Sequence, residues 1–488
     1  TRDNLVIPGL HDNHIHLIQA GILEKYEKLY STTSKEDAAR RIARFAETIP
    51  DEKWVMGVGF RRMSWEDTSM PDAGTLDAVI ADRPVFLMDE ELHMAWLNSR
   101  GLQECGIDKN TEAPDGGIIC RDENGEPTGV LLENAVALAA KHAFEFDKKT
   151  VKQLIEGYID KAVSLGITSV SDMTPYLSLD LSFPEVYFEM VSNNELKIRV
   201  NAARNLFEDI NTFNEIRQKA DLEGKGFYRV PYMKQFIDGT PANFTGMLLE
   251  DYSDNPGEKG KATIDLDKMA AAIETATENN ISVRLHSCGD RSCREAINAY
   301  ENALKKFPET ESRHMVEHLE LVDPNDIPRF GQLGIICSIQ PEHLAAGTMK
   351  WEENCYPEKL GPERERYTWP FKQLKDNGAV LAGGTDCPVV EGNLFWGMYA
   401  GNTRKYYDDI PEGGWNPQEK LTMPEMIDMF TSGAAYAEHR ENELGTLEEG
   451  KLADITVVDR NLLELEENPD IRDTKVLLTM VDGRVVYS

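Results

Sequence analysis

Two histidines separated by a single residue follow the first apolar run of the chain. They are His14 and His16, in the segment HDNHIHL. Side chains at positions i and i+2 of an extended chain point to the same face, so these two imidazoles can bind one metal ion. An HxH pair often arises by chance and is a weak signal when taken alone. It predicts a metal site only if other segments supply further ligands.

Further side chains that bind metals occur near the ends of later apolar runs. They are Lys234 in PYMKQFIDG, His286 in VRLHSCGD, His318 in MVEHLE and Asp386 in GGTDCPV. A single histidine at the end of a strand is usually a structural residue. Four histidines, a lysine and an aspartate in such places instead indicate a centre for one or two divalent metal ions. Zinc suits imidazole and carboxylate ligands, and manganese, iron or cobalt would also fit.

Lys234 is unusual because it lies inside an apolar run, where an unpaired ammonium group is costly to bury. Carbamylation of its amine by CO₂ would turn it into a carboxylate that bridges two metal ions. A lysine that reaches solvent or forms an ion pair is the alternative.

The chemistry that such a centre supports is hydrolysis. One or two divalent ions lower the pKa of a bound water and polarise a scissile carbonyl. Asp386 is the candidate general base and acid, which takes the proton of the water and returns it to the leaving nitrogen. A helix N-cap before Pro388 is the alternative role for this aspartate.

Strand-like and helical segments alternate along most of the chain. The strand-like runs are LVIPGL near the start, ITSVSDM (167–173), KIRVNAA (197–203), VPYMKQFI (230–237), ISVRLHS (281–287), RHMVEHLE (313–320), IICSIQ (335–340) and AVLAGGTD (379–386). This alternation predicts parallel strands, and eight such units predict an α/β fold of the (β/α)₈ TIM-like barrel type. The metal-competent residues then lie at the carboxyl ends of the strands, where the sites of such barrels are found.

We divide the chain into four parts. Residues 1–31 hold the first barrel strand and the metal motif, 32–150 an inserted segment, 151–440 the remainder of the barrel, and 441–488 part of a small β-sandwich. The inserted segment carries a helix (SKEDAARRIARFAETI), two strands (WVMGVGF and PVFLMDE) and a turn-rich stretch (DGGIICRDENGEPTGV), and is expected to roof the barrel mouth. The tail has two β-rich runs with an Asp-Gly turn signal. Because the chain starts at Thr1 without a methionine, we expect the partner strands of the sandwich upstream and leave a signal peptide open.

Composition restricts the partners. The 85 acidic and 52 basic residues give a formal net charge of -33, which disfavours binding to nucleic acid or anionic lipid. No apolar run approaches the roughly 20 residues of a membrane span. Seven scattered cysteines argue against a disulfide framework and favour a reducing, cytoplasmic compartment. We therefore expect a small-molecule substrate as the partner, and consider a homodimer without deciding the oligomeric state.

Several segments taken together resemble the amidohydrolase superfamily. They are PGLHDNHIHL, HSCGD, VEHLE, GGTDCPV and GTLEEGKLADITVVD. Four others are similar to its amidohydrolase-3, or YtcJ-like, branch, which includes N-substituted formamide deformylases: LHMAWLNS (92–99), GVLLENA (129–135), MKQFIDGT (233–240) and SIQPEH (338–343). The resemblance covers essentially the whole chain, and the combination is far more specific than any single segment.

The resemblance implies a role for each candidate ligand in a binuclear centre. His14 and His16 would bind the more buried ion, and His286 and His318 the second. A carbamylated Lys234 would bridge the two ions, and Asp386 would contact the metal and the attacking water.

One departure from related deaminases bears on the reaction. Those enzymes carry a proton-shuttling glutamate three residues after the fifth-strand histidine, where this chain has Gly289. Together with Lys234, this favours hydrolysis of an amide, a formamide or a cyclic amide over deamination. The same site could instead hydrolyse an ester, lactone or phosphoester, or catalyse a non-hydrolytic rearrangement. A binding protein that has lost the chemistry is disfavoured because none of the expected ligands is missing.

Other residues are weaker candidates. His93, Trp96 and His343 could contact the substrate, with structural or core-packing roles as alternatives. The sequence does not fix the side-chain direction of His11, and His314 is among the histidines that we interpret as structural or exposed.

Overall fold

The computed structural model describes residues 4–173, 181–345 and 349–488, which form two compact units. One unit holds residues up to 16 and nearly all residues from 159 onward, and the other holds residues 17–158.

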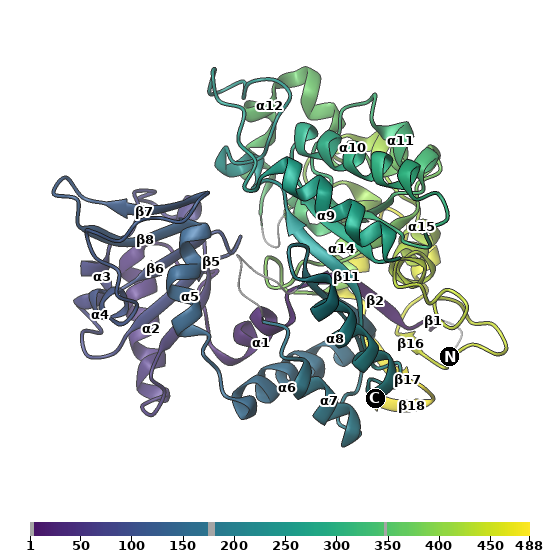
Figure 1. The fold of residues 1–488 in the computed structure, drawn as a ribbon, viewed down its shortest axis with the longest axis horizontal. Helices are drawn as coiled ribbons and strands as arrows, with labels where there is room; N and C mark the ends of the chain where they lie inside the picture. The colour runs from purple at the N-terminus through teal and green to yellow at the C-terminus, as the bar shows by residue number, and fades with distance from the viewer. Residues whose placement is uncertain (1–3, 174–180, 346–348) are drawn as a thin grey trace. The chain divides into compact units, whose positions relative to one another are not determined.

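The first unit is built around eight parallel strands, as the sequence predicts (Figure 1). They are β2 (Leu10–Ile15), β9 (Ile167–Asp172), β10 (Arg199–Asn205), β11 (Tyr228–Phe236), β12 (Ser282–Ser287), β13 (Met315–His318), β14 (Ile336–Ile339) and β15 (Leu381–Gly383). Each strand pairs with the next in chain order, and β2 and β15 are the two ends of the sheet. The arrangement is a nearly closed TIM-like barrel.

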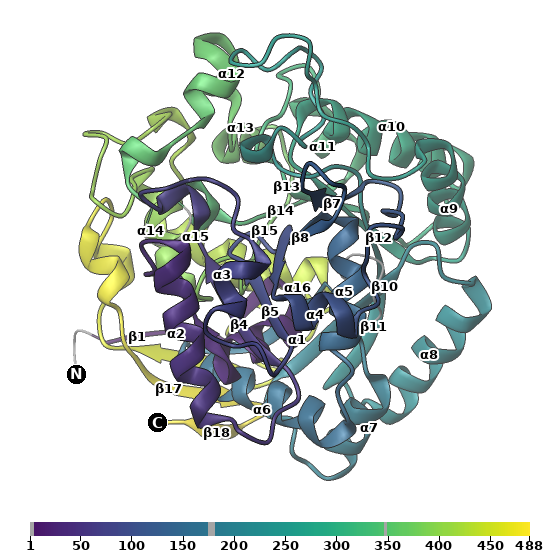
Figure 2. The ribbon, with the colours of Figure 1, turned by 90° about the vertical axis from the view of Figure 1, so that its left-hand side faces the viewer.

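A helix follows each strand from β9 to β15. These helices are α7 (Pro184–Ser192), α8 (Ile210–Glu223), α9 (Leu266–Glu278), α10 (Asp290–Lys306), α11 (Ile327–Leu333), α13 (Phe371–Asp376) and α14 (Leu394–Thr403). Figure 2 shows α8, α9 and α10 on the outside of the strands. In α10, Cys293, Ile297 and Tyr300 are buried at helical spacing, so one face packs inward.

Further helices complete the unit: α6 (Lys148–Ser164), which enters it from the second unit, α12 (Tyr356–Arg364), α15 (Met423–Asp428) and α16 (Ala434–Ala437). None of the described helices combines the length and the apolar composition that a membrane-spanning helix requires.

The run LVIPGL does not form the first barrel strand as predicted. Its residues Leu5–Pro8 form β1, which pairs antiparallel with β16 (Ile455–Val458), and the barrel strand β2 begins only at Leu10. The pattern was misleading because β1 and β2 follow each other with only Gly9 between them, so two strands of different sheets look like one run. His14 therefore lies inside the first barrel strand rather than after it.

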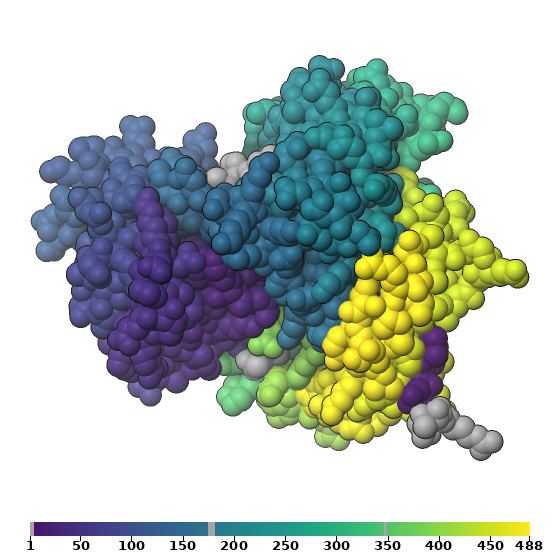
Figure 3. Space-filling model, turned by 90° about the horizontal axis from the view of Figure 1, so that it is seen from below, coloured from purple at the N-terminus to yellow at the C-terminus, as the bar shows by residue number. Residues whose placement is uncertain are grey.

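The two chain ends share a four-stranded antiparallel sheet of order β1-β16-β17-β18, with β17 at Val476–Val481 and β18 at Arg484–Tyr487. The predicted turn is present, and both Asp482 and Gly483 have positive φ, as a tight two-residue hairpin turn requires. Thr456 and Thr479 donate hydrogen bonds to the carbonyls of Gly166 and Val163, just before β9. This terminal sheet, which includes the C-terminal residues coloured yellow in Figure 3, is thus anchored at the amino end of the barrel strands.

The second unit is the inserted α+β segment. Its strands β3 (Glu27–Lys28), β4 (Val55–Phe60), β5 (Val85–Asp89), β6 (Met94–Leu97), β7 (Gly117–Arg121) and β8 (Pro127–Glu133) form one sheet of order β3-β4-β5-β6-β8-β7. Its helices are α1 (Leu17–Lys25), α2 (Lys35–Thr48), α3 (Ala73–Asp77), α4 (Ser99–Glu104) and α5 (Ala137–Ala143). The predicted helix and both strands are present, and the turn-rich stretch proves to be the β7–β8 hairpin. That this segment roofs the barrel mouth stays a prediction.

His314 is a buried structural histidine in the barrel unit. Its ring stacks on Tyr300 with centroids 4.6 Å apart, and its Nδ1 accepts a hydrogen bond from the backbone of Val283. Burial lowers its pKa from 6.5 to about 3. Because the folded pKa lies below the unfolded one, protons bind preferentially to the unfolded chain between these two values, and stability falls as the pH drops below 6.5.

We expect this histidine to cost about 2 kcal/mol of folding free energy at pH 5 relative to neutral pH, at roughly 1.4 kcal/mol per pH unit. Denaturant unfolding of the wild type and of His314→Asn, which keeps an acceptor near the position of Nδ1, should show it as a shallower pH dependence of the variant. The two proteins would lose stability equally on acidification if His314 titrated normally.

Candidate metal centre

The candidate ligands meet where the barrel closes. The backbone N–H of Asp386 donates to the carbonyl of His14 (2.7 Å), and that of His16 donates to the carbonyl of Cys387 (2.9 Å). A Cβ on Gly384 would lie 2.5 Å from the backbone nitrogen of His14. The second glycine of the GGTD segment therefore allows β2 to approach the end of β15 at backbone distance.

Asp12 strengthens the same closure. Its carboxylate accepts hydrogen bonds from the hydroxyl of Thr385 (2.6 Å) and from the backbone N–H of Thr385 (2.8 Å). Burial raises the pKa of Asp12 to about 7, although the bonds from Thr385 oppose that rise. The residue preceding Asp386 is thereby fixed to the strand that carries His14 and His16.

Three buried side chains have ligand atoms within 4.8 Å of one another: His14, His318 and Asp386. The Oδ1 atom of Asp386 lies 3.3 Å from Nε2 of His14 and 3.2 Å from Nε2 of His16. Its Oδ2 atom lies 3.8 Å from Nδ1 of His318 and 3.7 Å from Nε2 of His343. One carboxylate oxygen thus faces the HxH pair and the other faces two later histidines.

His286 and Lys234 lie beside this cluster. The ring centroid of His286 is 4.3 Å from that of His318. The amine of Lys234 is buried, lies 4.8 Å from the ring centroid of Phe236, and has no hydrogen-bond acceptor among the described residues. Burial lowers the pKa of Lys234 to about 8, against the opposing charges of Glu317 and Asp386.

Burial also favours the neutral form of His14 and His318. It lowers the pKa of His14 to about 4, assisted by Lys234, and holds the pKa of His318 well below its usual range. Burial raises the pKa of Asp386, but the imidazoles of His14, His16 and His343 outweigh it and hold that pKa below its ordinary value. Neutral imidazoles next to an ionised carboxylate are the protonation states that bind a metal ion.

The residues present fit a divalent ion. Among the described residues, Nε2 of His14, both ring nitrogens of His318, Nζ of Lys234 and Oδ1 of Asp386 are buried without a hydrogen-bond partner. Buried polar atoms are costly when unsatisfied, and such a concentration of them is unusual in a folded protein. Imidazole nitrogens and a carboxylate oxygen are ligands of zinc and of similar ions.

Sequence reasoning missed Glu317. Its Oε2 lies 2.5 Å from Nδ1 of His14, and its Oε1 accepts a 2.6 Å hydrogen bond from Nε of Arg284. Consecutive strand residues normally point to opposite faces. Here His318 and Leu319 have φ of 70° and 54°, so the chain leaves the extended conformation and both Glu317 and His318 reach the site. The sequence did contain a signal for this pair. Arg284 and Glu317 carry opposite charges, and they lie inside two successive apolar runs.

Asp238 was also missed. It accepts hydrogen bonds from the backbone of Met247, Cys288 and Gly289 and from the hydroxyl of Ser292. Its Oδ1 lies 4.0 Å from Nε2 of His286. The carboxylate therefore holds the segment after β12, and His286 with it, against the segment after β11.

The structure gives a steric reason for Gly289. A Cβ at this position would lie 2.1 Å from the carbonyl oxygen of Met247. A glutamate, which the related deaminases carry here, would require the segment around Met247 to move.

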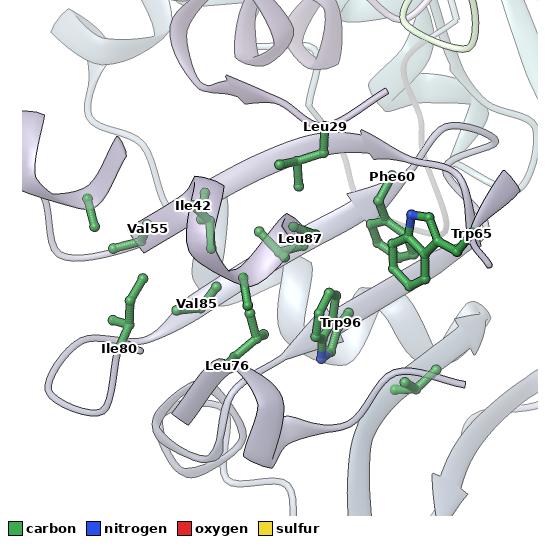
Figure 4. Close-up of a cluster of buried hydrophobic side chains, with 14 residues drawn as sticks. Leu29, Ile42, Val55, Phe60, Trp65, Leu76, Ile80, Val85, Leu87 and Trp96 are labelled. Atoms are coloured by element: carbon green, nitrogen blue, oxygen red, sulfur yellow. The ribbon is translucent and has the colours of Figure 1, made fainter. Parts of the chain in front are cut away.

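Two of the weaker candidates, Trp96 and His93, belong to the second unit. Trp96 is fully buried in the core of the second unit with Phe60 and Trp65, as Figure 4 shows, and donates its ring N–H to the carbonyl of Asp72. This corrects its assignment as a substrate contact, because its side chain packs in the core. His93 belongs to the same unit, where its Nδ1 lies 2.7 Å from Glu133; burial opposes protonation, but this carboxylate raises its pKa to about 10.

His11 contacts other residues than His14 does. Its Nδ1 lies 3.3 Å from the buried carboxylate of Glu438, which also accepts hydrogen bonds from Ser169. His11 is thus paired within the barrel and does not join the ligand cluster.

A sequence model of the amidohydrolase family (Amidohydro_3) matches residues 2–487. The chain belongs to the amidohydrolase family. The predicted resemblance is confirmed, and the ligand cluster lies at the strand ends of an amidohydrolase barrel.

Individual relatives align over almost the entire amidohydrolase chain. The protein LONG AFTER FAR-RED 3 of Arabidopsis thaliana is 29% identical, over 99% of this chain and 82% of its own. YtcJ of Bacillus subtilis (strain 168) is 28% identical, over 99% and 89%. An N-substituted formamide deformylase of Arthrobacter pascens is 24% identical, over 99% and 88%. The crystal structure of an uncharacterized metal-dependent hydrolase from Pyrococcus horikoshii shares the fold, with a TM-score of 0.75, 23% identity and coverage of 95% of this chain and 88% of that one.

Loss of ligands should remove bound metal. We expect purified wild-type protein to carry at least one divalent ion per chain, and His14→Ala and His318→Ala to carry far less, because each removes a nitrogen of the cluster. Elemental analysis by mass spectrometry measures this. His142→Ala, which changes a histidine of the second unit, is the matched control and should keep the wild-type content. Equal metal content in all four proteins would rule out the centre.

Proposed function

We propose that this amidohydrolase is a metal-dependent enzyme that cleaves the C–N bond of an amide, a formamide or a cyclic amide. The observation that carries the proposal is the placement of Asp386 between two groups of imidazoles at the barrel's strand ends. Candidate metal ligands and a candidate proton acceptor thus lie in one buried site. Hydrolysis of an unactivated carbonyl compound needs both.

His14, His16, His286 and His318 would hold one or two divalent ions together with Asp386. When bound, such ions supply an acidified water and polarise the scissile carbonyl. The donor set favours zinc, with manganese, iron or cobalt as the other candidates.

Asp386 would move the proton. Its ionised carboxylate accepts a proton from the attacking water and then donates it to the leaving nitrogen, which departs as the free amine. Burial keeps bulk water from competing for this proton, and the surrounding imidazoles keep the carboxylate ionised at the start of the cycle.

Lys234 would provide a ligand for the second ion. We propose that its amine adds to CO₂ with loss of a proton, which yields a carbamate that carries a negative charge. A buried amine without a hydrogen-bond acceptor among the described residues supports this proposal, since a carbamate would replace an unpaired cation by an anion among imidazoles.

His343 would contact the substrate. Its Nε2 lies 3.7 Å from Oδ2 of Asp386, and its ring lies parallel to that of His318 with centroids 5.9 Å apart. From this place it can donate a hydrogen bond to the carbonyl oxygen as negative charge develops there.

Two further observations support C–N bond hydrolysis. The segment around Met247 fills the space that a deaminase-type glutamate would need at Gly289. In addition, one of the full-length relatives is an N-substituted formamide deformylase, which favours formamides within the proposed class.

A hydrolysis screen tests the substrate class. We expect release of amine from N-formyl amines, aryl amides or cyclic imides, detected by an amine-reactive dye, and dependence of that release on added zinc. Turnover confined to small esters or lactones would contradict the proposed bond.

Asp386→Asn tests the proton transfer. We expect kcat to fall by about 10²- to 10⁴-fold, the usual effect of losing a general acid–base. Asp376→Asn, at an exposed aspartate paired with Lys372, should leave kcat unchanged. Wild-type turnover in Asp386→Asn would refute the assigned role.

Lys234→Gln tests the second ion. Wild-type protein prepared with ¹³C-bicarbonate should show a carbamate signal in its ¹³C spectrum, whereas the variant should lack it and retain fewer ions per chain. A wild-type protein with one ion and no carbamate would reduce the site to a mononuclear centre with a bare lysine.

A further inference from the structure

Arg284 and Glu317 form a fully buried ion pair directly behind the candidate metal centre. They lie on adjacent strands, β12 and β13, and neither side chain is exposed. Nε of Arg284 donates to Oε1 of Glu317 (2.6 Å), and Nη2 lies 3.3 Å from Oε2. That same Oε2 atom lies 2.5 Å from Nδ1 of His14.

Arg284, on β12, donates hydrogen bonds to residues of three other barrel strands. Beyond Glu317, its Nη2 donates to the backbone carbonyl of Asn13 on β2 (2.6 Å) and to the hydroxyl of Ser338 on β14 (3.1 Å). Its guanidinium also lies over the ring of Tyr232 at 4.9 Å. With so many fixed partners, the guanidinium holds the carboxylate of Glu317 in one orientation.

The orientation of Glu317 determines which nitrogen of His14 can bind a metal. A histidine whose Nδ1–H donates to a carboxylate has its proton on that nitrogen, and only Nε2 keeps a free electron pair. In this chain, Nε2 of His14 is the atom that faces Oδ1 of Asp386 at 3.3 Å. The ring is therefore held with its ligand atom directed into the cluster.

We propose that Arg284 and Glu317 are positioning residues of the metal centre, which fix the tautomer and ring orientation of His14 and thereby set the affinity for the ion. The proposal rests on the proposed metal-dependent function. It differs from a purely structural role, because a buried ion pair by itself adds little to stability and is often replaceable by apolar residues.

The chain offers a matched control for such a pair. Arg199 and Asp454 are also buried, each with 3% of the side chain exposed, and their closest atoms lie 2.8 Å apart. Asp454 accepts further bonds from the backbone of Asp482 and belongs to the region of the terminal sheet. Asp454→Asn thus disturbs a comparable buried carboxylate at the other end of the barrel.

The test measures zinc affinity and stability separately. Metal-free wild type, Glu317→Gln and Asp454→Asn are titrated with zinc against a chromophoric chelator, and their unfolding is followed in the presence of EDTA. We expect zinc affinity to fall by roughly 10- to 100-fold in Glu317→Gln, the usual effect of losing a carboxylate partner of a ligand histidine. Asp454→Asn should lose stability but keep wild-type zinc affinity.

The double variant Arg284→Met/Glu317→Gln separates positioning from folding. Removing both charges leaves no uncompensated buried arginine, so its stability without metal should exceed that of Glu317→Gln, whereas its zinc affinity should stay low. This variant also keeps the test valid if Glu317→Gln alone fails to fold. Wild-type zinc affinity in the double variant would overturn the proposal. Wild-type protein that binds no zinc would overturn the proposed function and this role with it.

Discussion

A barrel of eight parallel strands is complete only when its first and last strands meet, and in this chain they meet at the candidate ligands. No ladder joins β2 to β15 in the described sheet; a single bridge between Ile15 and Cys387 and a few hydrogen bonds do so instead. Those bonds place Asp386 against His14 and His16. The closure of the fold and the geometry of the site are therefore the same set of contacts, and Asp12 secures both through Thr385.

Many polar and charged side chains are buried inside the barrel. A guanidinium, several carboxylates and several imidazoles are buried there, and each requires compensation in a medium of low polarity. Arg284 and Glu317 compensate each other, and Glu438 lies against His11 and Ser169. Several atoms of the ligand cluster, such as Nε2 of His14 and Nζ of Lys234, have no hydrogen-bond partner among the described residues. These unsatisfied atoms lower the free energy of unfolding, and binding of an ion to them would raise it again.

Much of this architecture could be predicted from the sequence because its signals are local. The alternation of apolar runs and helices predicted the barrel, and the residues at the ends of those runs predicted the candidate ligands. Signals that depend on backbone conformation were not accessible. Glu317 and His318 both reach the site because the chain leaves the extended conformation at His318. Trp96 lies on β6, with its side chain in the core of the second unit. The run LVIPGL divides between two sheets at a single residue, which no periodicity reveals.

The terminal sheet has a practical consequence for handling this protein. Strands from both ends of the chain, β1 and β18, belong to one sheet that is anchored just before β9, whereas the ligand cluster lies at the opposite ends of the same barrel strands. A linker or solid support attached through this sheet would contact the amino-end face, away from the candidate metal centre. The terminal sheet is therefore a suitable place to attach the protein to a support, because the length of the barrel strands separates it from the ligand cluster.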